Sequence, residues 1–428
     1  MTFRDDLAAA SDWAASYVET MGERPVMARV EPGEIRTKLP ASPPDRAEPF
    51  ADVLRDFDEL IVPGLTLWNH PRFFAFFANT GSEPGILAEL LIATLNVNAM
   101  GWATSPAATE LEELTLDWLA QLLGLPPGWH GHIEDTASTS TIAALAGARE
   151  LRPGGAVYAS EHANFAIEKA VRLLGLEYRK VPLDDRFRML TDFPLDDATA
   201  VVATVGTTNT TSVDPVRELA GRCAEAGVWL HVDAAYAGSA CVCPEFRWCF
   251  DGVELADSVV VNPHKWLFTP VDCSTLWTRR PEALRAAFSA RADYMAGTEG
   301  VTDFRNYTPV LGRRFRALKL WAVLRCFGRE GLQALIREHV RLAALFEEWV
   351  RAEPGWEVSA PRLFSTVCFR HLEADNDEIV RRANEGGLIF IAPTKLRGET
   401  VLRLAIGNGW TSEDDVRIAW EVLRECVR

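Results

Sequence analysis

The sequence predicts an α/β protein whose central sheet is mostly parallel. Five short runs rich in β-branched and aromatic residues indicate strands, and stretches with helical spacing separate them. None of these runs alternates between apolar and polar residues, which is typical of strands buried on both faces. Strands that alternate with helices favour a parallel sheet. The expected strands are Ala156–Ala159, Ala200–Val205, Val228–Val232, Ser258–Val261 and Ser274–Trp277.

Further elements are expected on both sides of this region. Leu7, Ala10, Ala14 and Val18 recur at the spacing of one helix face. Other helices are predicted at Phe50–Ile61, Pro84–Asn96, Ala107–Leu123, Ala317–Phe327, Gly331–Val350 and from Glu413 onward, and C-terminal strands at Phe364–Phe369, Leu388–Ile391 and Val401–Ala405. We therefore expect a helical N-terminal segment (1–80), a large α/β domain (81–312) and a small α+β C-terminal domain (313–428).

Composition and charge exclude several classes of protein. Of the 428 residues, 48% are hydrophobic and 24% charged, as in ordinary globular proteins. The net charge of −16 repels phosphate backbones and acidic lipid surfaces, so we expect neither nucleic acid nor a membrane as partner. With no basic and apolar leader, we expect a cytoplasmic protein. The eight cysteines are expected as reduced, buried thiols, and no metal site is expected.

Polar residues stand where three of the predicted strands end. Asp233 follows one apolar strand, Lys265 comes shortly after the next, and a run of hydroxyl residues, Thr207–Ser212, follows a third. Ligands of open α/β sheets bind at such strand ends. A lysine amine can form a Schiff base with pyridoxal phosphate, while a carboxylate keeps the pyridine nitrogen of this cofactor protonated. A plain salt bridge between Asp233 and Lys265 is the alternative.

A phosphate group could be held by Thr136-Ala137-Ser138-Thr139, which precedes an alanine-rich helix. Hydroxyls and free backbone N–H groups at a helix N-terminus bind anions. The alternative for Thr136–Thr141 is a simple helix cap.

Longer motifs resemble those of one known family, the group II pyridoxal-phosphate decarboxylases. These motifs are His231-Val-Asp-Ala-Ala-Tyr-Ala-Gly-Ser-Ala240, Asn262-Pro-His-Lys-Trp266, Trp68-x-His-Pro71, Ser105–Glu112, Cys243–Arg247 and Leu311–Arg316. Within that family they are most similar to the aromatic-L-amino-acid decarboxylases, from about Pro63 to Arg424. The resemblance implies a type I aminotransferase-like fold, pyridoxal 5′-phosphate as cofactor, and a homodimer with active sites at the interface.

The resemblance also implies roles for matching positions. Lys265 would bind the cofactor covalently, Asp233 would pair with its ring nitrogen, and Ala235 would pack under the ring. Thr208 would lie near the cofactor hydroxyl, and the phosphate would be held by Ala137, Ser138, Asn262 and His264. The substrate side would be lined by Trp68, Phe76, Phe77 and Asn79, with Met100 supplied by the partner chain.

Two further positions bear on the reaction. Tyr294, in Arg291-Ala-Asp-Tyr294-Met-Ala-Gly, matches a catalytic tyrosine on a loop of this family; the alternative is a surface turn residue. Asn164 departs from the family pattern, because the decarboxylases have a histidine there that stacks on the cofactor ring. The nearby His162 is expected to be a structural histidine. Aldehyde-forming members of the family resemble this chain in having asparagine at this position.

Asparagine has no ionisable proton at neutral pH, so it cannot protonate the substrate carbon after CO2 leaves. We therefore expect decarboxylation of an L-amino acid coupled to oxidative deamination by O2. The alternatives are a simple decarboxylase that releases the amine, a pyridoxal-phosphate enzyme for β-elimination or transamination, and an inactive binding protein. The apolar pocket residues favour an aromatic or other apolar side chain. Asn79, Asn98 and Met100 differ from the residues usual in the aromatic-amino-acid decarboxylases that this chain resembles, so the alternative is an atypical substrate, such as a thioether-bearing amino acid.

Overall fold

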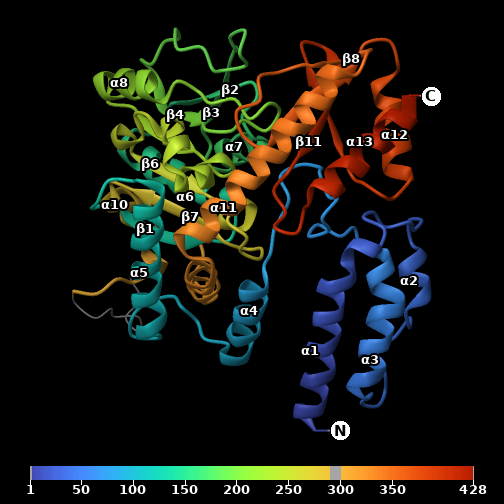
Figure 1. The fold of residues 1–428 in the computed structure, drawn as a ribbon. Coiled ribbons are helices and arrows are strands. Elements are labelled where there is room, and N and C mark those ends of the chain that lie inside the picture. Colours follow the sequence, from blue (N-terminus) through green and yellow to red (C-terminus); the bar gives the residue numbers. More distant parts are fainter. Residues whose placement is uncertain (1, 290–299, 428) are drawn as a thin grey trace.

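The computed structural model describes residues 2–289 and 300–427, and it confirms the predicted α/β fold (Figure 1). Within these residues, the main sheet has seven strands in the order β1-β7-β6-β5-β4-β2-β3. Neighbours from β6 to β3 are parallel, whereas β7 runs antiparallel to β1 and β6. The strands are β1 (His130–Glu134), β2 (Ala156–Ser160), β3 (Glu177–Val181), β4 (Ala198–Thr204), β5 (Trp229–Asp233), β6 (Ser258–Val261) and β7 (Ser274–Thr278).

The five strands predicted for this sheet are all present. Each of them is buried along its whole length, as the lack of polar alternation indicated. The sequence pattern did not reveal the two outermost strands, β1 and β3. Both carry polar residues and are partly exposed, because an edge strand has one side free of neighbours.

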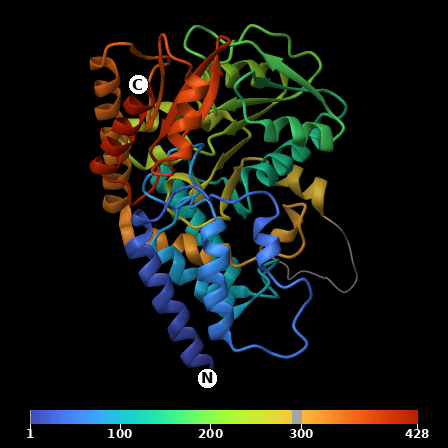
Figure 2. The same cartoon turned by 90° about the vertical axis from the view of Figure 1, so that its right-hand side faces the viewer.

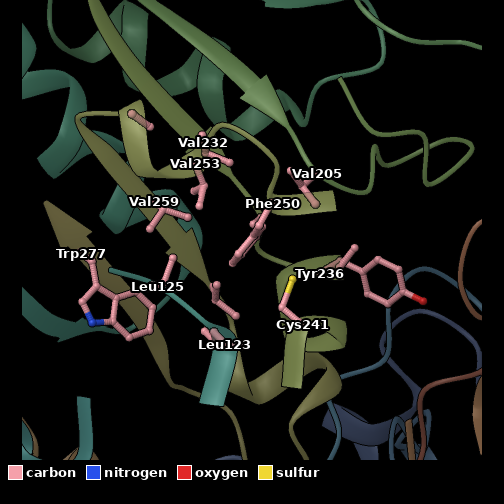
Figure 3. Close-up of a cluster of buried hydrophobic side chains, with 14 of the residues drawn as sticks. Leu123, Leu125, Val205, Val232, Tyr236, Cys241, Phe250, Val253, Val259 and Trp277 are labelled. Carbon is pink, nitrogen blue, oxygen red and sulfur yellow. The ribbon is translucent and has the colours of Figure 1, made fainter. Parts of the chain in front are cut away.

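Helices cover both faces of the sheet. One face carries α6 (Ala137–Leu151), α7 (Phe165–Leu173) and α10 (Pro281–Phe288), whose apolar side chains pack on alternate residues of β2, β4 and β6. The other face carries α5 (Pro106–Leu123), α8 (Val216–Ala226) and the first part of α11 (Arg316–Ala352). Figure 3 shows part of the core on this second face, where residues of neighbouring strands meet Leu123, Leu125, Phe250 and Val253.

The C-terminal part has its own sheet and its own core. Its four strands are antiparallel in the order β10-β11-β9-β8. The elements are β8 (Trp356–Val358), β9 (Thr366–His371), α12 (Asn376–Glu385), β10 (Ala392–Leu396), β11 (Glu399–Ala405) and α13 (Glu413–Val427). This core also contains the second part of α11, so α11 joins the two cores (Figure 1).

Two sequence-based expectations for this part need correction. The helices predicted at Ala317–Phe327 and Gly331–Val350 form one kinked element, α11, with a non-helical backbone at Gly328. The φ of 60° and ψ of −178° at Gly328 suit only glycine. The strand predicted at Leu388–Ile391 is absent: Phe390 makes an isolated bridge to Phe73, and the strand begins at Ala392.

The N-terminal helices lie together at one end of the molecule (Figure 2). They are α1 (Phe3–Thr20), α2 (Glu34–Lys38), α3 (Phe50–Asp56) and α4 (Glu83–Leu95), of which α4 packs on α11. Elsewhere, α9 (Pro263–Trp266) is a short helical turn after β6. The predicted helix at Phe50–Ile61 continues after α3 as a π-helical turn. No helix among the described residues is long and apolar enough to span a membrane. The domain limits at 80 and 312 stay predictions.

A buried ion pair fastens the large sheet to the helices around it. The Arg313 guanidinium donates to both carboxylate oxygens of Glu112 in α5, and each side chain is only 1% exposed. Arg313 also donates to the carbonyl oxygens of Ala99 and Ile133, and Glu112 accepts the N–H of Ile133. One pair of charges therefore holds together the loop at Ala99, helix α5 and strand β1.

We predict that Arg313→Met destabilises the protein by about 3–5 kcal/mol, because it leaves the Glu112 carboxylate buried without its partner. Thermal unfolding of the purified protein measures this as a lower midpoint. Glu112→Leu combined with Arg313→Met should recover part of the loss, since no charge is then buried. Arg381→Met, which breaks an exposed ion pair with Glu378, is the matched control. Equal midpoints for Arg313→Met and Arg381→Met would contradict the prediction.

Candidate active site

The candidate site is a pocket of about 190 Å³ at the carboxyl ends of the parallel strands. The strand order places β4, β5 and β6 side by side, with Asp233 opposite Thr204 and Val260. All ten residues predicted to bind the cofactor line this one pocket, although they come from five separate segments of the chain. They are Thr136, Ala137, Ser138, Asn164, Thr208, Asp233, Ala235, Asn262, His264 and Lys265.

Asp233 and Lys265 both line the pocket. Burial raises the pKa of the Asp233 carboxyl and lowers that of the Lys265 amine, and the opposite charge of each partly offsets this effect. No ion pair joins the two among the residues that the structure describes, so the alternative of a plain salt bridge is not observed. The Asp233 carboxylate accepts one backbone N–H, from Ala235. This anion therefore needs a further partner to be stable in the pocket.

A chain of polar side chains fixes Asn262 and His264. The Ser140 hydroxyl contacts that of Ser274, which donates to the Asn262 side-chain oxygen. The Asn262 amide lies 3.3 Å from His264 Nε2, and His264 Nδ1 accepts the N–H of Cys273 at 3.0 Å. Burial lowers the pKa of His264 to about 3, so its ring is neutral at pH 7. Both residues are thus held rigidly at the pocket wall.

The N-terminus of α6 offers an anion site beside them. Thr136 is the residue before the helix, and its side chain makes no capping hydrogen bond, so the simple cap considered from the sequence is not observed. The N–H groups of the first helical turn point along the helix axis and favour a negative ligand. Across the pocket, the buried Thr204 hydroxyl has no partner among the described residues.

These features fit pyridoxal phosphate. The helix N-terminus suits its phosphate, the under-satisfied Asp233 carboxylate suits its protonated ring nitrogen, and Lys265 supplies an amine for its aldehyde. The roles assigned to single residues remain predictions, because the pocket shows proximity rather than contact with a cofactor.

Asn164 caps helix α7 at the pocket wall. Its side-chain oxygen accepts the N–H of Ala166 at 2.9 Å, and its amide donates to the Thr208 hydroxyl at 3.3 Å. An N-cap prefers asparagine, aspartate, serine or threonine, so the residue at this position must cap the helix as well as lie beside the cofactor pocket.

His162 does not line the pocket: its ring stacks on Phe187 at 5.8 Å, as a structural histidine does.

The residues predicted for the substrate side are only partly brought together. Phe77 lines the cofactor pocket, and its ring stacks on Tyr236 at 3.8 Å. Trp68 and Phe76 stack on each other at 5.7 Å outside that pocket, where Phe76 is 48% exposed. Asn79 precedes Thr80, which hydrogen-bonds to the backbone of His264 and Lys265.

Two predicted residues cannot be placed in this chain's own pocket. Met100 does not line it, and its carbonyl accepts the N–H of Arg305. Its contribution to a partner's site stays a prediction. Tyr294 lies outside the described residues, and so does its loop, Arg291–Gly297.

Sequence reasoning missed Arg403, which comes from β11 of the second sheet and lies against Phe77 at the pocket wall. Its guanidinium lies 5.1 Å from the centre of the Phe77 ring, and the Lys265 amine lies 5.5 Å from the same ring. Arg403 is 3% exposed; its Nε donates to the carbonyl of Asn209, while the buried Nη2 has no partner among the described residues. A charged residue inside the apolar run Val401–Ala405 was the signal that could have revealed it.

The thiols agree only in part with the expectation. Described cysteines are all free, but Cys326 is exposed and Cys426 is half-buried. Cys241 and Cys249 lie with their sulfur atoms 3.4 Å apart in the core.

Comparisons with known proteins agree with this geometry. Residues 32–372 match the model of the pyridoxal-dependent decarboxylase conserved domain. The chain is 40% identical to the aromatic-L-amino-acid decarboxylase of Sus scrofa and 39% identical to the phenylacetaldehyde synthase of Arabidopsis thaliana, covering 96% and 97% of this chain and 93% of each relative. The crystal structure of Oryza sativa TDC with PLP and tryptamine superimposes with a TM-score of 0.95 at 36% identity, covering 99% of this chain and 97% of that one.

The chain therefore belongs to the pyridoxal-dependent decarboxylase family, as its motifs indicated. Its cofactor is pyridoxal 5′-phosphate.

Proposed function

We propose that this protein decarboxylates an aromatic L-amino acid and couples this step to oxidative deamination by O2. One amino acid, one O2 and one water give one aldehyde, one CO2, one ammonia and one hydrogen peroxide. The bonds from Cα to the carboxylate and to nitrogen break, Cα gains the carbonyl oxygen, and O2 takes up two electrons and two protons. The position of Asn164 beside the cofactor pocket carries this proposal.

An aromatic substrate is favoured by the side chains around the pocket. Phe77 and Tyr236 present stacked rings at its wall, and Trp68 and Phe76 form a further aromatic pair nearby. Flat apolar side chains pack well on such surfaces. Relatives that share more than a third of this sequence are named as aromatic-L-amino-acid decarboxylase and phenylacetaldehyde synthase, which supports the same substrate class.

Pyridoxal phosphate, when bound, draws electrons away from the substrate Cα, so that the bond to the carboxylate can break. Asp233 holds the proton on the ring nitrogen, which strengthens this withdrawal. Arg403 binds the substrate carboxylate, because its buried Nη2 has no partner among the described residues and its guanidinium lies 5.1 Å from the ring centre of Phe77, which lines the cofactor pocket. Lys265 would hold the cofactor covalently through its side-chain amine.

The product depends on a proton at Cα. A positioned general acid accelerates such a transfer by about 10²–10⁴-fold. Asn164 has no ionisable proton, and its oxygen is already engaged by Ala166. Slow protonation gives O2 time to oxidise the substrate carbon, and the imine formed in this way hydrolyses to the aldehyde.

The second candidate is simple decarboxylation to the amine, with Tyr294 as the proton donor. Retention of a tyrosine at this position favours it. β-Elimination and transamination differ from both candidates because neither releases CO2.

We also propose a homodimer, formed on the apolar faces of α1 and α4. Helix α1 buries none of its side chains, although Leu7, Ala14 and Val18 share one face. Across a groove of about 450 Å³, α4 presents Leu87 and Leu90, which are 63% and 42% exposed. Apolar surface of this extent is typical of an interface, and a second copy of the chain would cover it.

We predict that Asn164→His raises the amine share of the product and lowers the ratio of peroxide to CO2. The imidazole can protonate Cα before O2 reacts. Purified holoenzyme is incubated in air with L-Phe, L-Tyr, L-Trp and L-Dopa, and CO2, amine, aldehyde, peroxide and O2 uptake are measured together.

The control for that variant is Asn164→Ser, because the change to histidine also removes the cap of α7, at a cost of about 0.5–2 kcal/mol. Serine keeps the cap but supplies no ionisable proton, so its product ratio should stay close to that of the native enzyme. If the native enzyme releases amine in equal amount to CO2 without O2 uptake, the oxidative proposal is wrong.

For Arg403, we predict that Arg403→Met raises the KM for the amino acid by about tenfold or more, since a charge-assisted hydrogen bond to the carboxylate is lost. Arg403→Lys should restore part of the affinity. Steady-state CO2 release measures both variants, and phenethylamine, which has no carboxylate, is the matched ligand. A similar loss of affinity for this amine would assign Arg403 to packing rather than to carboxylate binding.

A further inference from the structure

A second and larger pocket lies on the other side of the hairpin that follows β4. It has a volume of about 710 Å³, which is ample for a small organic ligand. Its walls come from this hairpin, from the connection between β3 and β4, from the 3-10 turn η5 (Pro244–Phe250) and from the segment before β9. None of the residues assigned to the cofactor lines it, so this outer pocket is separate from the candidate active site.

One wall of the outer pocket offers a flat aromatic surface. The Trp248 indole is 48% exposed and stacks on Phe364 at 5.8 Å with an angle of 6° between the rings. Leu363 and Pro215 extend this apolar wall. A half-exposed indole fixed by a second ring is a favourable surface for another aromatic ring.

The other wall offers an available positive charge. Among the described residues, Arg186 uses its backbone N–H and carbonyl in hydrogen bonds, but its guanidinium engages no partner. Its neighbour Arg188 is held by Asp184. A free guanidinium beside an aromatic surface fits a carboxylate attached to an aromatic ring.

The carboxylates of the outer pocket are already engaged by donors. Asp251 is paired with Arg217, and Glu218 accepts the hydroxyl of Thr191. Asp214, at the floor, accepts the backbone N–H groups of Met189 and Thr204 at 2.8 Å. Among the residues that the structure describes, Arg186 is therefore the cation of this pocket that no carboxylate pairs, while Glu218 keeps its negative charge elsewhere in the lining.

A chain of hydroxyl groups connects the outer pocket with the active site. The Ser212 hydroxyl donates to the carbonyl of Arg186 at 2.9 Å and contacts the Thr210 hydroxyl at 2.8 Å. Thr210 in turn contacts the Thr207 hydroxyl at 3.1 Å. The next residue, Thr208, accepts the amide of Asn164 in the cofactor pocket. The hydroxyl run noted in the sequence thus links Arg186 with Asn164.

We infer that the outer pocket binds an aromatic carboxylate, with its ring on Trp248 and its carboxylate on Arg186, and that binding there changes the affinity of the active site through the hydroxyl chain. The coupling is reciprocal, so bound substrate changes the affinity of the outer pocket by the same factor. This inference does not depend on whether the enzyme releases aldehyde or amine.

Indole-3-acetate is a suitable probe, because it is an aromatic carboxylate without the amino group that a substrate needs. Its binding to the holoenzyme is measured by isothermal titration calorimetry. We expect saturable binding that weakens at least fivefold in Trp248→Ala and in Arg186→Gln. Arg172→Gln, which changes an exposed arginine outside the pocket, should bind as the native protein does. Indole-3-acetamide, which lacks the charge, should bind more weakly than the acid.

The link to the active site is tested by the KM for the amino acid with and without indole-3-acetate. We expect a change of several-fold in the native enzyme and in Arg172→Gln, and a smaller change in Thr210→Val, which interrupts the hydroxyl chain but leaves the outer pocket in place. Absence of saturable binding, or equal affinity in Trp248→Ala, Arg186→Gln and native protein, would overturn the site. Binding at the outer pocket without any change in KM would overturn the link.

Discussion

The structure depends on one costly feature, a carboxylate at the buried end of a central strand. Asp233 ends β5 with the backbone N–H of Ala235 as its donor, in surroundings that raise its pKa. A buried anion of this kind is stable only with a cationic partner, and Lys265 lies too far away to form an ion pair with it. A protonated ring held between the two satisfies both. The strand order, which sets β4, β5 and β6 side by side, creates the space for this ring.

The residues around that ring serve the fold and the chemistry together. Asn164 fixes the start of α7 with its oxygen and touches Thr208 with its amide, so its orientation is set before any ligand arrives. Thr208 belongs to a hairpin whose other end meets the outer pocket. A small displacement of this hairpin would move Thr208 and thereby alter its hydrogen bond with Asn164. Asn164, which we propose selects the product, therefore lies at the end of the hydroxyl chain that begins at the outer pocket.

Much of this could be predicted from the sequence, for identifiable reasons. Strands buried on both faces leave continuous apolar runs, and Asp233 and Lys265 stand out because charged residues rarely follow such runs. The edge strands β1 and β3 could not be identified from the sequence, because partly exposed strands contain polar residues and leave no continuous apolar run. Leu388–Ile391 is as apolar as a strand, but its burial comes from core packing and from a bridge to Phe73. The charge inside its apolar run marks Arg403 as unusual but does not place it at the site, since only tertiary packing brings the second sheet to Phe77.

The protonation state of the cofactor ring tests the central claim most directly. Holoenzyme loaded with pyridoxal phosphate labelled with ¹⁵N in the ring can be compared with the Asp233→Asn variant by NMR. The account predicts the chemical shift of a protonated pyridine nitrogen in the native protein and that of an unprotonated nitrogen in the variant. An unprotonated ring in the native protein, or the same shift in both, would contradict it.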